Sequence, residues 1–177
     1  MIYMVDHVYK DPATEQAWHA WYSGYLQKLI SVPGIHTAQR FKAVGCTPSR
    51  YLAMYSIDSE DVYSSEGYRS IGGGGSQSAR FHDAYQTWTR NLFEGADRAP
   101  VVKEGQRVLA FDRNERGEDH QFGSRALWLK AVGLHMTTPY RAIVVLDAAE
   151  TASAAGVKGS FLYEPYTAAL VAAARPG

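Results

Sequence analysis

The spacing of apolar residues near the start of the chain predicts a strand followed by a helix. In residues 2–9 (IYMVDHVY) the pattern has period two, so one strand face carries Tyr3, Val5, His7 and Tyr9. From about residue 12 to 31 the apolar side chains recur every three or four positions, which is typical of a helix with one apolar stripe. Asp11 and Pro12 are suited to begin this helix, and the sequence VPG at 32–34 is suited to end it.

The pattern that follows completes one structural unit. The expected elements are strands at 35–44 and 50–58, helices at 58–70 and 76–93, and a closing strand at about 106–112. Their order is β-α-β-β-α-β, which is the arrangement of a ferredoxin-like unit. The sequence therefore predicts an α+β protein.

The second half of the chain resembles a shortened copy of the first. Residues 41–61 (FKAVGCTPSRYLAMYSIDSED) align with residues 129–150 (LKAVGLHMTTPYRAIVVLDAAE), which share KAVG and match Tyr51 with Tyr140. A one-residue gap between KAVG and the tyrosine gives this match, and it also matches Asp58 with Asp147. The alternative is that two hairpins share four residues by chance. We expect a ferredoxin-like α/β-barrel repeat at 1–112 and a degenerate, truncated second repeat at 113–177 that packs on it and lacks a full first helix.

This arrangement also leads to an expectation about assembly. A four-stranded sheet with helices on one face leaves its other face bare, and a patch of that size is normally covered. We therefore expect a homodimer, or an internal pseudo-dimer in which the second repeat closes the barrel.

Composition narrows the classes of partner. The chain has 18 basic and 18 acidic residues and no net charge, so nothing predicts binding to nucleic acid or to an anionic membrane. A single cysteine, Cys46, fits a reducing compartment. Asp6 and His7 lie where a signal peptide would need an apolar run, and no apolar stretch is long enough to span a membrane. We expect a cytoplasmic protein whose partner is a small molecule.

Several familiar site types do not fit the sequence. The glycine run at 72–75 has no lysine followed by Ser or Thr, so it is not a phosphate loop; it is suited to form the edge of a pocket, or else an ordinary surface loop. The histidines, which include His120, show no paired metal-ligand spacing, so we expect no metal site. No serine elbow is present, and Cys46 has no recognisable base nearby.

Aromatic side chains instead converge on one place. In the expected fold the strand face with Tyr3 and His7 meets the helix stripe, which contains Trp21, Tyr22 and Tyr25. Tyr51 and Tyr55 are expected on one face of the third strand, where they would extend this wall. Twelve tyrosines are more than a core of this size needs, because each buried hydroxyl requires a partner. The alternatives are a slot for a flat, mostly apolar ligand and ordinary core packing.

Four segments carry a resemblance to a known superfamily. They are PGIHTAQRF, YLAMYSIDSED, SSEGYRSIGG and ARFHDAYQTW. Together they are similar to the dimeric α/β-barrel superfamily, which includes antibiotic-biosynthesis monooxygenases, EthD-like proteins, muconolactone isomerase and polyketide cyclases. The resemblance covers residues 1–112 and reaches the remainder only through the proposed repeat.

The resemblance to the cyclases of this superfamily implies site residues. It implies a pocket formed by Tyr3, Val5, His7, Trp21, Tyr22, Tyr25 and Tyr68. A loop histidine ahead of a phenylalanine is the base in those cyclases; Phe81 matches the phenylalanine, but the histidine of this region is His82. His7 is the other candidate for the base. Arg80 is a candidate to hold a carboxylate, and Tyr68 is a candidate to donate to an enolate oxygen.

Two enzyme classes and one non-enzyme class compete on this basis. The main expectation is a cofactor-free acid/base isomerase or tautomerase, or else a cyclase, dehydratase or lyase, acting on an aromatic-derived or polyketide-like carbonyl compound in aromatic catabolism. The alternative is a cofactor-independent monooxygenase of a phenolic substrate, which differs in consuming oxygen. A non-catalytic binding or stress-response module is the third, and its tyrosines would fill the pocket.

Overall fold

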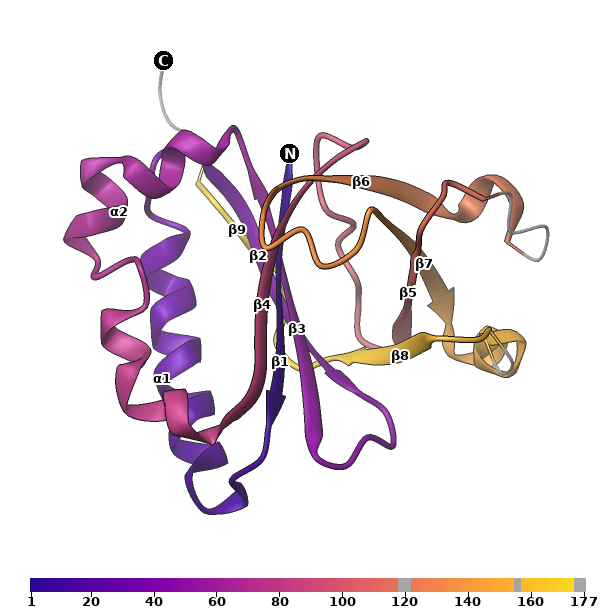
Figure 1. Cartoon of the computed structure of the whole chain (residues 1–177), viewed down its shortest axis with the longest axis horizontal. Helices are drawn as coiled ribbons and strands as arrows, with labels where there is room; N and C mark the ends of the chain where they lie inside the picture. The colour runs from indigo at the N-terminus through magenta and orange to yellow at the C-terminus, as the bar shows by residue number, and fades with distance from the viewer. Residues whose placement is uncertain (118–121, 155–156, 174–177) are drawn as a thin grey trace.

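A computed structural model describes residues 1–117, 122–154 and 157–173 (Figure 1). Its strands are β1 (Ile2–Tyr9), β2 (Ile35–Ala43), β3 (Ser49–Ile57), β4 (Tyr85–Glu94), β5 (Gln106–Arg113), β6 (Leu127–Leu134), β7 (Tyr140–Asp147), β8 (Ser160–Pro165) and β9 (Leu170–Val171). Its α-helices are α1 (Pro12–Leu29) and α2 (Glu66–Ser70), and its 3-10 helices are η1 (Glu60–Ser64), η2 (Ser76–Ala84), η3 (Gly123–Arg125) and η4 (Ala148–Ala154).

Eight of the described strands close into an antiparallel barrel. Around the ring the order is β3-β1-β4-β6-β7-β5-β8-β2, and β2 pairs again with β3 to complete it. The short strand β9 lies beside β2, next to the segment that β8 covers. Closure leaves the eight barrel strands without a free edge, so every strand ladder has a partner. The α+β class expected from the sequence is confirmed.

Helix α1 follows the predicted signals closely. The Asp11 side chain accepts a hydrogen bond from the backbone N–H of Ala13 at 3.0 Å, and Pro12 occupies the first turn. Both features satisfy a helix start, where backbone N–H groups have no partner within the helix. Figure 1 shows α1 and α2 together on one side of the wall formed by β1, β3 and β4. The stripe of α1 packs on that wall, as the sequence pattern predicts.

The helix expected at 76–93 is wrong in its second half. Residues 76–84 form the 3-10 helix η2, but residues 85–94 form strand β4. The segment YQTWTR is rich in threonine and aromatic residues, which favour a strand. Strand β4 pairs with β1 along its whole length and so takes the place expected for 106–112. Residues 106–113 form β5, which pairs with β7 and β8 instead.

Three apolar clusters form the core. One lies between α1 and the outer face of β1 and β3, and it contains Trp18, Tyr22 and Leu26. The second fills the barrel interior with side chains such as Met4, Phe93 and Leu129. The third lies on the outer face of β5 and β7. The described residues between β5 and β6 include only the short helix η3, so this outer face has no counterpart of α1 in the part of the chain that the structure describes.

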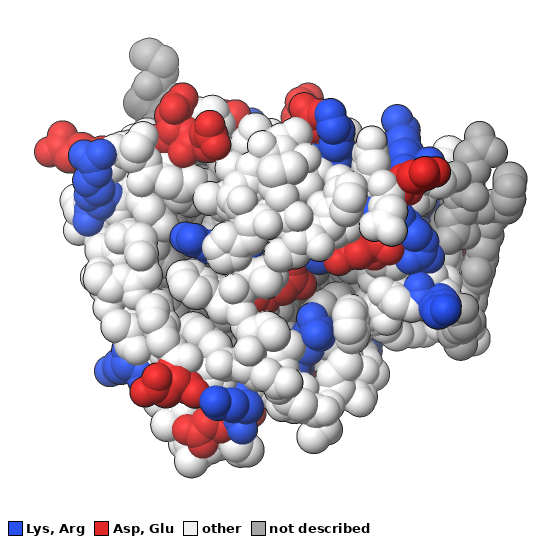
Figure 2. Space-filling model, viewed as in Figure 1, with Lys and Arg blue, Asp and Glu red and all other residues white. Residues whose placement is uncertain are grey.

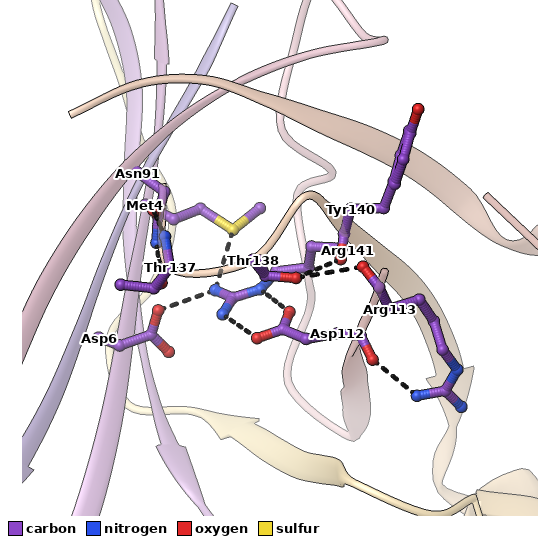
Figure 3. A network of polar contacts seen from close by, with 9 residues as sticks. All are labelled: Met4, Asp6, Asn91, Asp112, Arg113, Thr137, Thr138, Tyr140 and Arg141. Atoms are coloured by element: carbon purple, nitrogen blue, oxygen red, sulfur yellow. Dashed lines mark hydrogen bonds and ion pairs between the residues drawn. The ribbon is translucent and has the colours of Figure 1, made fainter. Parts of the chain in front are cut away.

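A charged network crosses the barrel interior (Figure 3). The Arg141 guanidinium donates to Asp6 at 2.8 Å and to both carboxylate oxygens of Asp112 at 2.7 and 3.0 Å. Asp6 comes from β1, Asp112 from β5 and Arg141 from β7, so the network joins the two halves of the chain. Although burial alone would lower the pKa of Arg141, the two carboxylates raise it above its ordinary value.

The barrel bears on the expectation of assembly. The inner face of the first four strands is covered by β5 to β8 of the same chain, so the argument from a bare sheet face does not require a partner chain. The homodimer stays a prediction. None of the helices formed by the described residues is long and apolar enough to cross a membrane. On the face shown in Figure 2, Lys and Arg side chains alternate with Asp and Glu, with wide uncharged areas between them.

Candidate functional site

A pocket lies between the outer face of the first strands and the helices that cover it. Strands β1, β3 and β4 form its floor, α1 forms one wall, and the segment from α2 to η2 forms its edge. Its cavity volume is about 60 Å³, and the space between its atoms rises to about 650 Å³ when the open solvent at its mouth is included. Its lining residues are Tyr3, Val5, His7, Trp21, Tyr22, Tyr25, Leu29, Ile35, Tyr55, Tyr63, Tyr68, Gly72, Gly74, Gly75, Gln77, Ser78, Tyr85, Trp88 and Arg90.

The pocket walls consist largely of aromatic rings. Trp21 and Tyr25 are one helical turn apart on α1, and their rings stack at 5.3 Å with 13° between the planes. On the strand side the Tyr3 and Tyr55 rings stack at 5.4 Å. Stacked rings on opposite walls present flat, apolar surfaces with hydroxyl groups at their edges. The lining is therefore suited to a flat aromatic ligand that carries a few polar groups.

Three buried phenols of this pocket stay protonated. Burial is the largest cause that raises the pKa of Tyr3, Tyr22 and Tyr55 above the ordinary tyrosine value. The hydroxyls of Tyr22 and Tyr55 lie 2.8 Å apart and share a hydrogen bond. A protonated phenol can donate to an oxygen atom of a ligand. These residues can consequently bind a ligand and hold it in one orientation.

His7 is the buried titratable group of the pocket. It is 3% exposed, and its ring contacts the rings of Trp18, Tyr22 and Tyr85 at 5.2, 5.7 and 5.1 Å. Burial, followed by the positive charge of Arg40, lowers the pKa of His7 to about 3. The imidazole is therefore neutral at physiological pH. Among the described residues no side chain or backbone group forms a hydrogen bond with it, which leaves its nitrogens for a ligand.

The glycine run forms the edge of the pocket. Gly74 and Gly75 have φ angles of +90° and +94°, which residues with a side chain rarely adopt. A Cβ atom on Gly73 would lie 2.3 Å from the Tyr68 ring, so only glycine lets the backbone approach this ring. The Tyr68 hydroxyl accepts a hydrogen bond from the Gly74 N–H at 3.2 Å. The segment therefore wraps around Tyr68, and its expected place beside the pocket is confirmed.

The structure brings most of the candidate residues to this pocket. The predicted residues that line it are His7, Tyr68, Tyr3, Trp21, Tyr22, Tyr25 and Tyr55. Tyr51 does not line the pocket, because its hydroxyl is held near the start of α1 by Glu15 at 2.5 Å and His19 at 3.1 Å. Phe81 is buried behind the wall and contacts Trp21 at 5.7 Å. Arg80 is exposed and lies over the ring of Phe81 at 4.7 Å.

His82 lies outside the pocket lining. Its Nε2 and the Ser78 hydroxyl are 2.9 Å apart, and its ring contacts Tyr85 at 5.6 Å and Trp88 at 5.5 Å. Tyr85 is also in contact with His7, so the Tyr85 ring contacts both candidate bases, His7 on β1 and His82 on η2. His82 thus supports the η2 segment beside the pocket, and His7 is the histidine that faces the cavity.

Several pocket residues were not expected. Tyr85, Trp88 and Arg90 come from β4, and the expected helix hid their strand register. The threonine-rich and aromatic-rich sequence YQTWTR is the signal that could have revealed them. Tyr63 lies on η1 and contacts the Tyr3 ring at 4.8 Å. In the described ranges, which leave out His120, no three His, Cys, Asp or Glu side chains gather in a group that could hold a metal ion.

No protein-family model matches this chain, and no curated protein matches it. Solved structures do resemble it in fold. An anthrone oxidase-like protein matches with a TM-score of 0.62 and 9% identity, over 97% of this chain and 92% of that one. A candidate monooxygenase from Fusobacterium nucleatum matches with a TM-score of 0.57 and 8% identity, over 94% and 92%. At such low identity these likenesses show the fold alone.

The comparisons correct the main functional expectation. An isomerase, tautomerase, cyclase, dehydratase or lyase is not what these neighbours are; they are oxidase-like or monooxygenase-like. The expectation of an enzyme agrees with the neighbours, whereas the isomerase or lyase reaction does not. The alternative of a monooxygenase is the one that they favour.

Proposed function

We propose that this chain is a monooxygenase of phenolic aromatic compounds in which the substrate itself reduces dioxygen. The observation that carries the proposal is His7, a buried neutral imidazole with no hydrogen-bond partner among the described residues, in a pocket lined by aromatic rings. A buried polar group is nearly always hydrogen-bonded to protein or to water, so in the open pocket the His7 imidazole can bind water or a ligand that replaces it. A phenolic hydroxyl has the hydrogen that such a nitrogen accepts.

The proposed reaction balances without a further reductant. For a phenol with a free position opposite its hydroxyl, dioxygen inserts one atom at that carbon as a quinone carbonyl, and the other atom leaves as water. The O–H and C–H hydrogens of the substrate enter that water, and the substrate supplies the four electrons that reduce dioxygen. His7 accepts the phenol proton and returns it to the oxygen atom that leaves. The protonated tyrosines of the pocket donate to the substrate oxygens and orient the ring.

Two kinds of finding support the oxygen-dependent reaction over other uses of the pocket. The stacked walls formed by Trp21 with Tyr25 and by Tyr3 with Tyr55 suit a flat, electron-rich ring. The similar structures include an anthrone oxidase-like protein, whose name points to a polycyclic phenolic class of compound. We therefore propose hydroxylated polycyclic aromatics as the first compounds to test.

The test is oxygen uptake with a panel of such phenols, followed by mass spectrometry of the product formed under isotope-labelled dioxygen. We expect one labelled atom in the product and one in water. The His7→Phe variant should lose a factor of about 100 to 10,000 in rate. The His82→Phe variant is the matched control and should lose less than about tenfold, because His82 does not line the pocket. Turnover that continues without oxygen would refute the proposal.

We also propose that the chain is a duplicated ferredoxin-like unit that forms an internal pseudo-dimer. Strand pairing supports this, because β1 pairs with β3 and β4 just as β5 pairs with β7 and β8. The hairpins match in register as well: Lys42 is opposite Tyr51, and Lys130 is opposite Tyr140, as the sequence alignment requires. The mass in analytical ultracentrifugation should be that of one chain. A dimer that separates only on unfolding would contradict this version.

A further inference from the structure

Arg40 is a charged residue in the layer between α1 and the sheet. It lies on the outer face of β2 and is 1% exposed. Its guanidinium carbon is 4.0 Å from the centre of the Tyr22 ring and 4.5 Å from that of Trp18. Tyr51 and Tyr166 complete an aromatic cage around it at 5.7 and 5.3 Å. The faces of aromatic rings attract a cation, so the cage holds the guanidinium in place.

One side of Arg40 is held by a hydrogen-bond chain with a fixed direction. Its Nη2 lies 3.2 Å from His19 Nδ1, and an arginine can only donate. His19 Nδ1 must therefore accept, so Nε2 carries the hydrogen and donates to the Tyr51 hydroxyl at 3.1 Å. Tyr51 donates in turn to the Glu15 carboxylate at 2.5 Å. A carboxylate thus reaches Arg40 only through two intervening side chains.

The charge of Arg40 has no direct counter-ion in the described part of the chain. No carboxylate of the described residues forms an ion pair with it, and its Nη1 is buried without a hydrogen-bond partner there. Burial lowers the pKa of Arg40, but an arginine side chain stays charged in proteins. A buried charge without a partner is costly, and this cost is offset when an anion binds close by.

The pocket lies directly on the other side of the cage. Tyr22, whose ring is in contact with Arg40, also lines the pocket and contacts the His7 ring. The titratable groups that face Arg40 are His7 from β1, His19 and Tyr22 from α1, Tyr51 and Tyr55 from β3, and Tyr166 after β8. Burial lowers the pKa of both histidines and raises that of Tyr22, Tyr51 and Tyr55, so none of these five groups carries a negative charge at neutral pH.

We infer that Arg40 is a fixed positive charge behind the aromatic pocket that selects the phenolate form of the bound ligand. This inference rests on the proposed function, since it names the ionic form of the same substrate. A fixed cation in a site with little water stabilises the phenolate and so lowers the pKa of a bound phenol. Arg40 acts through space and through Tyr22, so it is a positioning residue.

The experiment is a spectrophotometric titration of p-nitrophenol bound to the whole protein. This probe changes colour on ionisation, so absorbance gives its pKa in the pocket. In the wild-type protein we expect a value about one unit or more below that of the free probe, which is a tenfold or larger preference for phenolate. In the Arg40→Met variant the value should return to that of the free probe or rise above it. The Arg40→Lys variant keeps the charge and should keep most of the shift.

Arg80→Met is the matched control, because it removes an exposed arginine on η2 that lies outside the pocket lining. Its bound probe should ionise as in the wild type. Binding of the neutral phenol by the wild-type protein would overturn the inference whether or not the variants fold. An equal shift in wild type and Arg40→Met would also overturn it. The titration needs no oxygen, so its result is independent of the oxygen-uptake assay. If the pKa of the bound probe is shifted but no phenol causes oxygen uptake, the proposed reaction is refuted and the role of Arg40 stands.

Discussion

Two buried arginines in this protein have opposite surroundings. Arg141 lies inside the barrel, 6% exposed, and every contact that Figure 3 shows for its guanidinium leads to Asp6, Asp112 or the Met4 sulfur. Arg40 lies in the outer layer, 1% exposed, with aromatic rings and one histidine around it. Both charges are removed from water, yet only Arg141 has carboxylate partners among the described residues.

The difference separates a structural charge from one that is available to a ligand. The carboxylates that hold Arg141 come from β1 and β5, so this ion network locks the two halves of the barrel in register. Removing one partner of such a network leaves an uncompensated charge in the interior. Arg40 already exists in that state, and the neighbouring pocket is where its missing anion can bind. Arg141 thus stabilises the barrel, whereas Arg40 places a positive charge next to the pocket.

The largest effect expected from this comparison is on the barrel. In the Asp6→Ala variant, Arg141 loses the more buried of its two carboxylates, whose side chain is 9% exposed. We expect the free energy of unfolding to fall by about 3 kcal/mol, because the buried guanidinium keeps only the more exposed Asp112 as a carboxylate partner. Urea denaturation of the variant and the wild type measures this difference.

A double variant distinguishes charge from packing at that site. Adding Arg141→Met to Asp6→Ala removes the stranded charge, and Asp112 can then be hydrated, because its side chain is 44% exposed. At least half of the lost stability should return. If the double variant is as unstable as the single one, the network acts through shape and not through charge.

The sequence was sufficient to predict the first four elements of the fold and much of the pocket. Period-two and period-three-to-four patterns placed β1, α1, β2 and β3 within one or two residues, because each element has a buried face of its own. His7 and Tyr55 then fell on the pocket side through strand alternation alone. The shared register of the two hairpins was also visible in the KAVG alignment.

The rest depended on contacts between distant segments. Strand β4 was mistaken for a helix because its residues Tyr85, Trp88 and Leu92 also fit a helical spacing, and only its pairing with β1 and β6 decides between the two. Tyr51 has the same strand face as Tyr55, but Glu15 and His19 bind its hydroxyl away from the pocket. Arg40 and Lys42 lie on the same face of β2, and periodicity alone does not show that Arg40 is the buried one of the two.

The pH dependence of stability tests the outer layer separately, because acid acts on His7, which is neutral in the folded protein. The pKa of His7 is about 3 in the folded protein, lowered by burial and by the charge of Arg40, against an ordinary value of about 6.5. Below pH 6.5 the unfolded chain therefore binds a proton that the folded chain excludes. The stability linked to this group is complete above about pH 6.5 and is lost as the pH falls toward 3.

We expect His7 to account for a loss of about 2 kcal/mol in the free energy of unfolding between about pH 7 and pH 5. The His7→Phe variant lacks this group, so its stability should depend less on pH by that amount. Urea denaturation at the two pH values measures the difference between the two proteins. Equal pH dependence in both would show that His7 titrates normally and is not desolvated in the pocket.

The smallest effect on stability is expected at Arg40 itself. The Arg40→Met variant loses the ring contacts and the bond to His19, which together stabilise the folded state by an amount on the order of 1 to 3 kcal/mol. It also loses the cost of burying a cation without a counter-ion, and the flexible methionine fills much of the same space. These terms oppose each other, so the net change should stay below about 1.5 kcal/mol, well under that of Asp6→Ala. Urea denaturation of both variants under one condition makes the comparison. A loss at Arg40 as large as that at Asp6 would mean that this charge is already compensated within the fold, and the outer arginine would then be a second structural one.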